Sequence, residues 1–366
     1  MSDNRRRFRA IRDGLRGLYP DEPQGNFARH LNTLAGLISG IVGSKRVNLP
    51  AIAGKVPDGT KKESRVKRFS RWVVNDQVTI ELYFLPFAEA LLCSLAERTL
   101  LLVMDGSEVG RECLTLMASV VYHKRALPVA WIVVRGSKGH FSDEAHVRLL
   151  AEVQALVPEG SDVMVTGDGE FDGLVFQAAM ADYGWKYVCR TAVNTQVCSD
   201  GEWLALRDIA IWPGKRIGLP DVGFTAQAYG PVLAIAWWRT GCKEPLYLVT
   251  NLDLVEEACF WYAKRFRIET FFSDQKSRGF HLHKSHLSDP VRLARLMIAA
   301  CLAYIWIVFL GAMAKRDGWV AVIHRTDRCD LSLFQLGLSL LEHLLNEHLP
   351  IPIAFQMPVR SKSVRQ

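Results

Sequence analysis

The sequence lacks the marks of several protein classes. It has eight cysteines in 366 residues but no Cys-x-x-Cys pair, so it is no small disulfide scaffold, and we expect free buried thiols in a reducing cytosol. It contains no internal repeat and no low-complexity tract. No apolar stretch follows the arginine-rich N-terminus, so we expect no secretory signal. Hydrophobic residues make up 49% and charged residues 23%, which excludes a disordered or collagen-like chain and allows a large core.

Positive charge is concentrated in the first fifth of the chain. Residues 1–72 hold 16 lysines and arginines against 6 acids, whereas the remaining 294 residues hold 29 bases and 32 acids. Clustered bases bind phosphates with release of counterions, so a polyanion such as DNA is expected to meet this segment. A solvated basic tail is the alternative that charge alone leaves open.

One uncharged segment has the length of a membrane span. Residues 296–314 lie between Arg295 and Lys315 and contain no charge. The segment is solitary, and small residues such as Ala303 and Gly311 suit close packing of helices inside a protein. We therefore expect a core helix and no membrane, with a membrane-anchored protein as the alternative.

The basic N-terminal part is expected to be largely helical. Residues 1–24 indicate a mobile basic arm. Helical spacing of apolar residues predicts helices over residues 27–42, 49–53 and 61–74. The last of these carries four bases that we expect to contact DNA: Lys61, Lys62, Arg65 and Arg68.

The period of the apolar residues changes after residue 98. Runs rich in valine, leucine and isoleucine predict strands, and amphipathic stretches predict helices. In chain order these are three strands (99–104, 114–122, 129–134), a helix (142–157), a strand (162–166), a helix (171–183) and a strand (186–190). This is the order of a ribonuclease-H-like α/β fold, which a final helix completes. We expect that helix at 254–280, after a β-rich insertion with strands at 223–229, 232–239 and 246–250.

The expected fold class is thus α/β, with a ribonuclease-H-like core, a β-rich insertion, a preceding helical DNA-binding domain and following C-terminal helices. The expected divisions are a basic arm (1–24), a helical domain (25–97), a catalytic core (98–192 and 251–290), an insertion (193–250) and a C-terminal helical region (291–366). Helices are expected there at 291–314 and 331–346. The leucines of the second indicate a core contact, with an oligomer contact as the alternative.

Two aspartates stand at expected strand ends. Asp105 follows the apolar run 100–104 and precedes a glycine, and Asp168 follows the run 163–167 between two glycines. Groups at the strand ends of an α/β sheet gather where ligands bind. Each aspartate taken alone is more often a turn residue. Neighbouring acids are alternatives to them: Glu108 for Asp105, and Glu170 or Asp172 for Asp168.

A third acid lies in the expected helix 254–280. At about 100° per residue, Tyr262, Arg265, Glu269 and Lys276 project within about 60° of the helix circumference. The alternative is a solvated face with an ordinary Arg265–Glu269 ion pair. Three converging carboxylates suit Mg²⁺, for which Mn²⁺ can substitute, and two such ions support phosphoryl transfer. The arginine, the lysine and the tyrosine hydroxyl would then hold neighbouring phosphates.

Three histidines follow this helix. His281, His283 and His286 have no cysteine or carboxylate at zinc-site spacing, so we expect phosphate contacts or packing for them.

The polar stripe resembles a family signature. Tyr262, Arg265, Glu269 and Lys276 have the spacing Tyr-x2-Arg-x3-Glu-x6-Lys, which is similar to that of bacterial DDE transposases of insertion-sequence family four. The stretches around the two aspartates, Met104-Asp105-Gly106-Ser107-Glu108-Val109 and Asp168-Gly169-Glu170-Phe171, also resemble the family, although the family usually has arginine where Gly169 stands. The resemblance covers residues from about 30 to 315 and selects Asp105, Asp168 and Glu269 as catalytic metal ligands.

The resemblance implies a function. The chain would bind the terminal inverted repeats of an insertion sequence as a homodimer, nick each end with water and join the 3′-hydroxyl to target DNA, in the bacterial cytoplasm at the nucleoid. Tyr247 stands roughly where the family often has a tryptophan that stacks on a flipped base. Trp237 or Trp238 would be substitutes, although a core role is expected for both. A catalytically silent, transposase-derived DNA-binding protein is the alternative.

Overall fold

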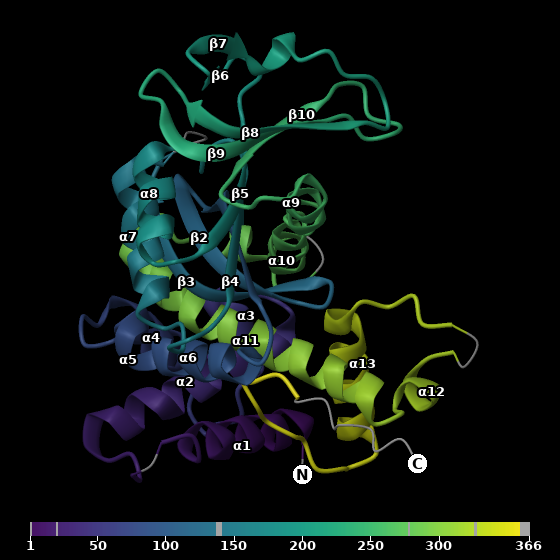
Figure 1. Ribbon diagram of the computed structural model, residues 1–366. Coiled ribbons are helices and arrows are strands. Elements are labelled where there is room, and N and C mark those ends of the chain that lie inside the picture. The colour runs from purple at the N-terminus through teal and green to yellow at the C-terminus, as the bar shows by residue number, and fades with distance from the viewer. Residues whose placement is uncertain (1, 20, 137–140, 277–278, 326–327, 359–366) are drawn as a thin grey trace.

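A ten-stranded mixed sheet runs through the molecule and carries helices on both faces (Figure 1). The computed structural model describes residues 2–19, 21–136, 141–276, 279–325 and 328–358. The strands are β1 (Leu100–Gly110), β2 (Cys113–Tyr122), β3 (Arg125–Arg135), β4 (Val163–Gly167), β5 (Lys186–Thr191), β6 (Gln196–Ser199), β7 (Glu202–Ala205), β8 (Arg216–Phe224), β9 (Tyr229–Trp237) and β10 (Leu246–Thr250). Their order in the sheet is β3-β2-β1-β4-β5-β10-β9-β8-β6-β7. The expected mixed α/β class is confirmed.

Thirteen α-helices lie in the parts of the chain that the structure describes. They are α1 (Asp3–Arg16), α2 (Gly25–Ser44), α3 (Leu49–Ala53), α4 (Lys62–Val74), α5 (Ile80–Tyr83), α6 (Leu85–Leu95), α7 (Asp143–Gln154), α8 (Leu174–Asp182), α9 (Val255–Tyr262), α10 (Arg267–Gln275), α11 (Pro290–Arg316), α12 (Val320–Ile323) and α13 (Leu333–Asn346). Two short 3₁₀ helices complete the list, η1 (Leu206–Asp208) and η2 (Leu282–Lys284).

The first half of the sheet combines antiparallel and parallel pairing. Strands β1, β2 and β3 form an antiparallel meander, β1 is parallel to β4, and β4 is parallel to β5. Every residue of β4 is buried, as expected of a parallel strand covered on both faces. Helix α7 begins at the N-cap Ser142, whose hydroxyl accepts a hydrogen bond from the Ala145 amide. The predicted order of strands and helices in this region is confirmed.

The strands between β5 and α9 extend the same sheet. Strand β10 pairs antiparallel with β5 on one side and with β9 on the other. The strand predicted at 223–229 was wrong, because Thr225 and Ala228 adopt positive φ angles in the turn between β8 and β9. Alternation of apolar residues locates a hairpin, but its turn depends on backbone conformations that the pattern does not encode.

The N-terminal segment is a packed helix, so the predicted mobile arm was wrong. Helix α1 buries Ile11 and Leu15 completely. The Arg7 guanidinium donates to the Ser39 carbonyl and hydroxyl, and Arg6 donates to carbonyls at and just beyond the C-terminal end of α13. These two arginines satisfy backbone acceptors inside the protein instead of remaining free for a polyanion.

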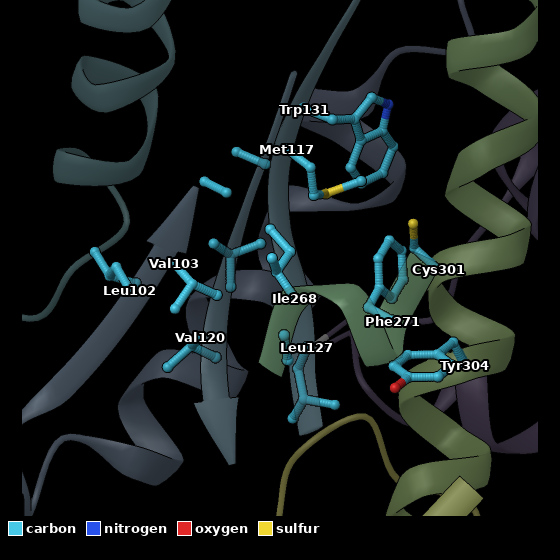
Figure 2. Packing of buried hydrophobic residues seen from close by; sticks show 14 of the residues in the cluster. Leu102, Val103, Met117, Val120, Leu127, Trp131, Ile268, Phe271, Cys301 and Tyr304 are labelled. Atoms are coloured by element: carbon cyan, nitrogen blue, oxygen red, sulfur yellow. The ribbon is translucent and has the colours of Figure 1, made fainter. Parts of the chain in front are cut away.

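Helix α11 is a core helix, as expected. In its most apolar window 94% of the residues are buried within the protein, although its length and hydropathy would allow it to cross a membrane. The backbones of α11 and α13 lie close together at Gly311. A Cβ added to this glycine would lie only 1.8 Å from the Leu333 carbonyl oxygen. Figure 2 shows Cys301 and Tyr304 of α11 near Ile268 and Phe271 of α10, with side chains of β1, β2 and β3 beyond them.

Candidate active site

Asp105 lies on β1 where the parallel pairing with β4 stops. That pairing ends at Val103 opposite Thr166, whereas the antiparallel pairing with β2 continues past Asp105 to Gly110. The prediction that the strand ends just before Asp105 was therefore wrong, because the hairpin with β2 extends β1. Asp105 nevertheless lies near the carboxyl end of β4, and its side chain is 18% exposed.

Asp168 follows β4 directly and shapes the turn there. Its Oδ1 accepts a hydrogen bond from the Glu170 amide at 3.1 Å, and its carbonyl accepts one from the Phe171 amide. The chain packs tightly at this turn, since a Cβ on Gly167 would lie 2.5 Å from the Phe171 side chain. Asp168 thus has the turn role that its sequence position allows, and its carboxylate also acts electrostatically on Asp105.

The predicted single helix over 254–280 was wrong, because the chain breaks between α9 and α10. The amides of Lys264, Arg265, Arg267 and Ile268 each bond to a carbonyl three residues earlier, which tightens the chain into turns. No glycine or proline stands at the break. Tertiary contacts therefore override local helix propensity: Tyr262, the last residue of α9, and Arg265, within the break, are both buried.

Helix α10 presents Glu269 on its open side. Ile268 and Phe271 of this helix are buried, and Figure 2 shows them beside the sheet and α11. The Glu269 side chain is 56% exposed. The apolar face of α10 thus holds the helix against the core and leaves the carboxylate accessible.

The Arg265 guanidinium lies between two of the predicted carboxylates. Its Nη1 is 3.6 Å from Asp105 Oδ2, and its Nη2 is 3.6 Å from Glu269 Oε1. The pKa of Asp105 is raised to about 7. Burial is the largest cause, the nearby Asp168 carboxylate is the second, Arg265 opposes the shift, and Glu269 adds a small increase. Asp105 therefore senses the other two predicted carboxylates and Arg265.

Tyr262 and Lys276 flank this centre. Burial raises the pKa of Tyr262, with Arg265 and then Arg190 opposing the shift, so the phenol stays a neutral donor. Lys276 Nζ donates to Ser107 Oγ at 2.6 Å, and burial lowers the pKa of Lys276 while Glu108 and Asp105 oppose the shift. The lysine borders a cavity of about 290 Å³, lined also by Gly106, Ser107, Glu108, Leu114, Phe141 and Glu170.

The alternative acids have other contacts. Glu108 is exposed on β1 and lies near Lys276. The Glu170 carboxylate accepts from the Phe141 amide and lies 3.4 Å from His146 Nε2. Burial raises the pKa of Asp172, and a hydrogen bond with Thr191 opposes that shift.

Tyr247 does not offer a stacking surface. It pairs with Thr191 in the sheet and is only 4% exposed, because β10 lies between β5 and β9. Trp237 is buried, as expected for a core residue, with the guanidinium groups of Arg216 and Arg239 over its ring. The Trp238 indole donates to the Cys242 carbonyl.

The four basic residues predicted to contact DNA fall into two pairs. Lys61 and Lys62 are exposed at the start of α4. Arg65 and Arg68 instead lie 3.8 Å and 2.8 Å from carboxylate oxygens of Asp58, so part of their charge is balanced within the protein.

Sequence reasoning missed three polar residues beside the centre. Ser107 receives the Lys276 hydrogen bond, Arg190 lies near Tyr262, and His146 faces Glu170. Arg190 could have been found, because it stands near the end of β5 beside β4, the same kind of position that singled out Asp168. The other two contacts join segments that no sequence pattern links.

A family model described as a transposase DDE domain matches residues 104–306, which is more than half of the chain. The match begins one residue before Asp105 and ends within α11. The chain belongs to the DDE transposase family.

A comparison with curated proteins finds no match. Among solved structures, the chain resembles the cryo-EM structure of the piggyBac transposase synaptic complex with hairpin DNA at a TM-score of 0.48 and 12% identity, over 97% of this chain and 83% of that one. A likeness this distant does not support any assignment of roles to the residues of the site.

The family name raises the question of a metal ion. Within the residues that the structure describes, no three side chains of His, Cys, Asp or Glu stand close enough together to hold one. This includes His281 and His283, whose rings are 5.9 Å apart. The oxygen donors themselves suit a hard cation. The pKa of Asp105 is raised first by burial and then by repulsion from the Asp168 carboxylate, and a divalent ion would relieve that repulsion. The residues of this DDE transposase chain thus fit Mg²⁺ or Mn²⁺ by chemistry, with Arg265 between two of them.

Proposed function

We propose that this chain is the transposase of an insertion sequence, which cleaves DNA at the transposon ends and joins the freed 3′-hydroxyls to target DNA in a metal-dependent reaction. One observation carries the proposal: the pKa of Asp105 on β1 is raised by burial and by the carboxylates of Asp168 at the end of β4 and Glu269 on α10. A titratable group whose pKa is shifted by burial and by neighbouring carboxylates is typical of catalytic sites. Membership in the DDE transposase family gives this cluster its chemistry.

We further assign the chain to insertion-sequence family four and its core to the ribonuclease-H-like class. The spacing of Tyr262, Arg265, Glu269 and Lys276 supports the first assignment. The strand order β3-β2-β1-β4-β5, with the first three antiparallel and the last three parallel, supports the second.

Asp105, Asp168 and Glu269 would hold the divalent ions. Bound there, Mg²⁺ or Mn²⁺ would activate the attacking water or 3′-hydroxyl and balance charge on the scissile phosphate. The Glu269 side chain is 56% exposed, so a phosphate of the duplex would have access to a metal ion held there.

The neighbouring polar residues would orient the DNA backbone. Arg265 would exchange its carboxylate partners for a phosphate when DNA and metal arrive, since both of its present contacts are long at 3.6 Å. Lys276, held by Ser107, would place a second positive charge beside the cavity. The neutral Tyr262 hydroxyl would donate a hydrogen bond to a phosphate oxygen.

The expected partners are double-stranded DNA at the terminal inverted repeats and at the target, and a second copy of the chain in the DNA complex. The expected location is the bacterial cytoplasm, at the nucleoid. These statements rest on family membership and the resemblance of the motif.

A cleavage assay tests the function. Labelled duplex carrying the element's end is incubated with Mg²⁺ or Mn²⁺ and with wild type, Glu269→Gln or Glu256→Gln, the last being an exposed acid on α9. We expect nicking and joining by wild type and Glu256→Gln, and a loss of at least about 10³-fold in Glu269→Gln, as for removal of a group that stabilises the transition state. Wild type that binds the duplex but cuts with neither ion would instead support the silent DNA-binding alternative.

A further inference from the structure

A polar pocket of about 390 Å³ lies between the N-terminal half of α2 and the C-terminal half of α4. It shares no lining residue with the cavity beside Lys276. Its lining contains arginines and amides but no acid: Asn26, Arg29, His30, Asn32, Thr33, Arg68, Arg71, Trp72 and Asn75. The mouth is accessible, because Asn26, Arg29 and Arg71 are all exposed.

A hydrogen-bond network holds part of the wall in place. The Asn75 amide lies 3.1 Å from His30 Nε2, and His30 Nδ1 lies 2.8 Å from the Tyr83 hydroxyl. Since Nε2 accepts from the amide nitrogen, Nδ1 carries the proton and donates. Burial lowers the pKa of His30, which keeps the ring neutral. The positive charge of the pocket therefore comes mainly from Arg29 and Arg71, because Asp58 balances part of the charge of Arg68.

The wall also holds donors without acceptors. Within the described parts of the chain, the indole Nε1 of Trp72 and the Nε of Arg68 are buried and have no hydrogen-bond partner, and Trp72 is 3% exposed. The first turn of α2 contains no acid, and the Gln24 side chain does not cap it. A helix N-terminus, unpaired donors and arginines all favour an anion that accepts hydrogen bonds.

We propose that this pocket binds a backbone phosphate of duplex DNA, with the amides of Asn26 and Asn32 beside the adjoining nucleotide. The inference rests on the proposed function and deepens it, because it places a duplex contact on residues of α2 and α4 that are separate from the carboxylates. It also shifts the expected contact along α4, from Arg65 and Arg68, which both lie near Asp58, to Arg71.

Two substitutions test the pocket without touching the carboxylate site. Asn26→Asp puts an acid into the first turn of α2, where a negative charge favours the helix, so the melting temperature should not fall. The same acid repels a phosphate, so we expect about tenfold weaker binding of duplex. Arg71→Gln should weaken binding about tenfold and reduce the slope of log K against log salt concentration by about one.

The measurement is fluorescence anisotropy of a labelled duplex carrying the element's end, without divalent ions and over a series of KCl concentrations. Arg207→Gln, which neutralises an exposed arginine in η1, is the matched control and should bind like wild type. If Asn26→Asp and Arg71→Gln bind duplex with wild-type affinity and salt slope, the pocket proposal is overturned, while wild-type cleavage would leave the proposed function standing. Wild type that binds no duplex at all would overturn both. If wild type bound duplex RNA of the same sequence more tightly than duplex DNA, and Asn26→Asp and Arg71→Gln lost that binding, the assignment to DNA would be overturned.

Discussion

At the scale of single residues, the ionisation of Asp105 is controlled by its surroundings. A free aspartate has a pKa near 3.8, and burial together with Asp168 raises that of Asp105 to about 7 in the folded chain. Arg265 limits the shift from 3.6 Å away. A carboxyl in this state is poised between its neutral and charged forms at neutral pH, and a cation bound beside it would favour the charged form.

This shift predicts a pH-dependent stability. Because the folded pKa is raised, the unfolded chain loses the proton first, so the free energy of unfolding falls as pH rises from about 4 to about 7. Replacing the carboxyl in Asp105→Asn removes this cost. We expect the metal-free variant to gain about 2 kcal/mol over wild type between pH 5 and pH 8, measured by urea unfolding.

Glu159→Gln, at an exposed turn acid, is the control and should follow wild type at both pH values. Adding Mg²⁺ at pH 8 should stabilise wild type more than Asp105→Asn, since an ion that binds only the native state shifts the equilibrium. An equal difference between wild type and Asp105→Asn at pH 5 and pH 8 would contradict the raised pKa.

At the scale of elements, α10 is anchored at the end opposite to the Arg265 break. Asp274 lies 2.7 Å from Arg125 on β3 and 3.5 Å from the Tyr304 hydroxyl on α11, and both charged side chains are largely buried. Gln275 next to it donates to the Ala300 carbonyl. Buried polar contacts thus hold α10, the helix that carries Glu269, against strand β3 and helix α11.

Removing one partner of this pair should be costly. In Asp274→Asn the Arg125 charge stays buried without its counterion, so we expect a loss of about 3 kcal/mol in the free energy of unfolding. The double variant Arg125→Met/Asp274→Leu should recover much of that loss, because it removes both charges of the buried pair. Urea denaturation measures both. An Asp274→Asn protein within about 0.5 kcal/mol of wild type would show that the pair does not anchor α10.

At the scale of the whole molecule, the two ends of the chain stabilise each other. Arg6 of α1 donates to the carbonyls of Leu345 and Leu349, which lie at and beyond the end of α13. Helix α13 packs closely on α11, where a Cβ on Gly337 would lie 1.8 Å from the Ile307 carbonyl oxygen. Helix α11 in turn packs on β3 and α2. The N-terminal helix, the core helix and the sheet therefore form one connected core.

A core mutation in α1 tests this connection. Ile11 is fully buried, so Ile11→Ala should lower the free energy of unfolding by about 2–4 kcal/mol and should do so in the same transition that unfolds the sheet. Arg5→Gln, on the exposed side of the same helix, should change it by less than about 0.5 kcal/mol. If Ile11→Ala had no effect, residues 1–24 would behave as the mobile arm that their charge suggested.

The sequence by itself determined the order of the central strands and helices, the burial of α11 and the candidate residues. Runs of Val, Leu and Ile and the placement of small residues reflect local preferences, so they can be read directly from the sequence. Tertiary structure alone decided that α1 packs, that the chain breaks after Tyr262, that Tyr247 is buried and that Arg265 lies between Asp105 and Glu269. The physical reason is that each of these outcomes depends on contacts between segments far apart in the sequence, whose energies exceed local propensity and leave no pattern along the chain.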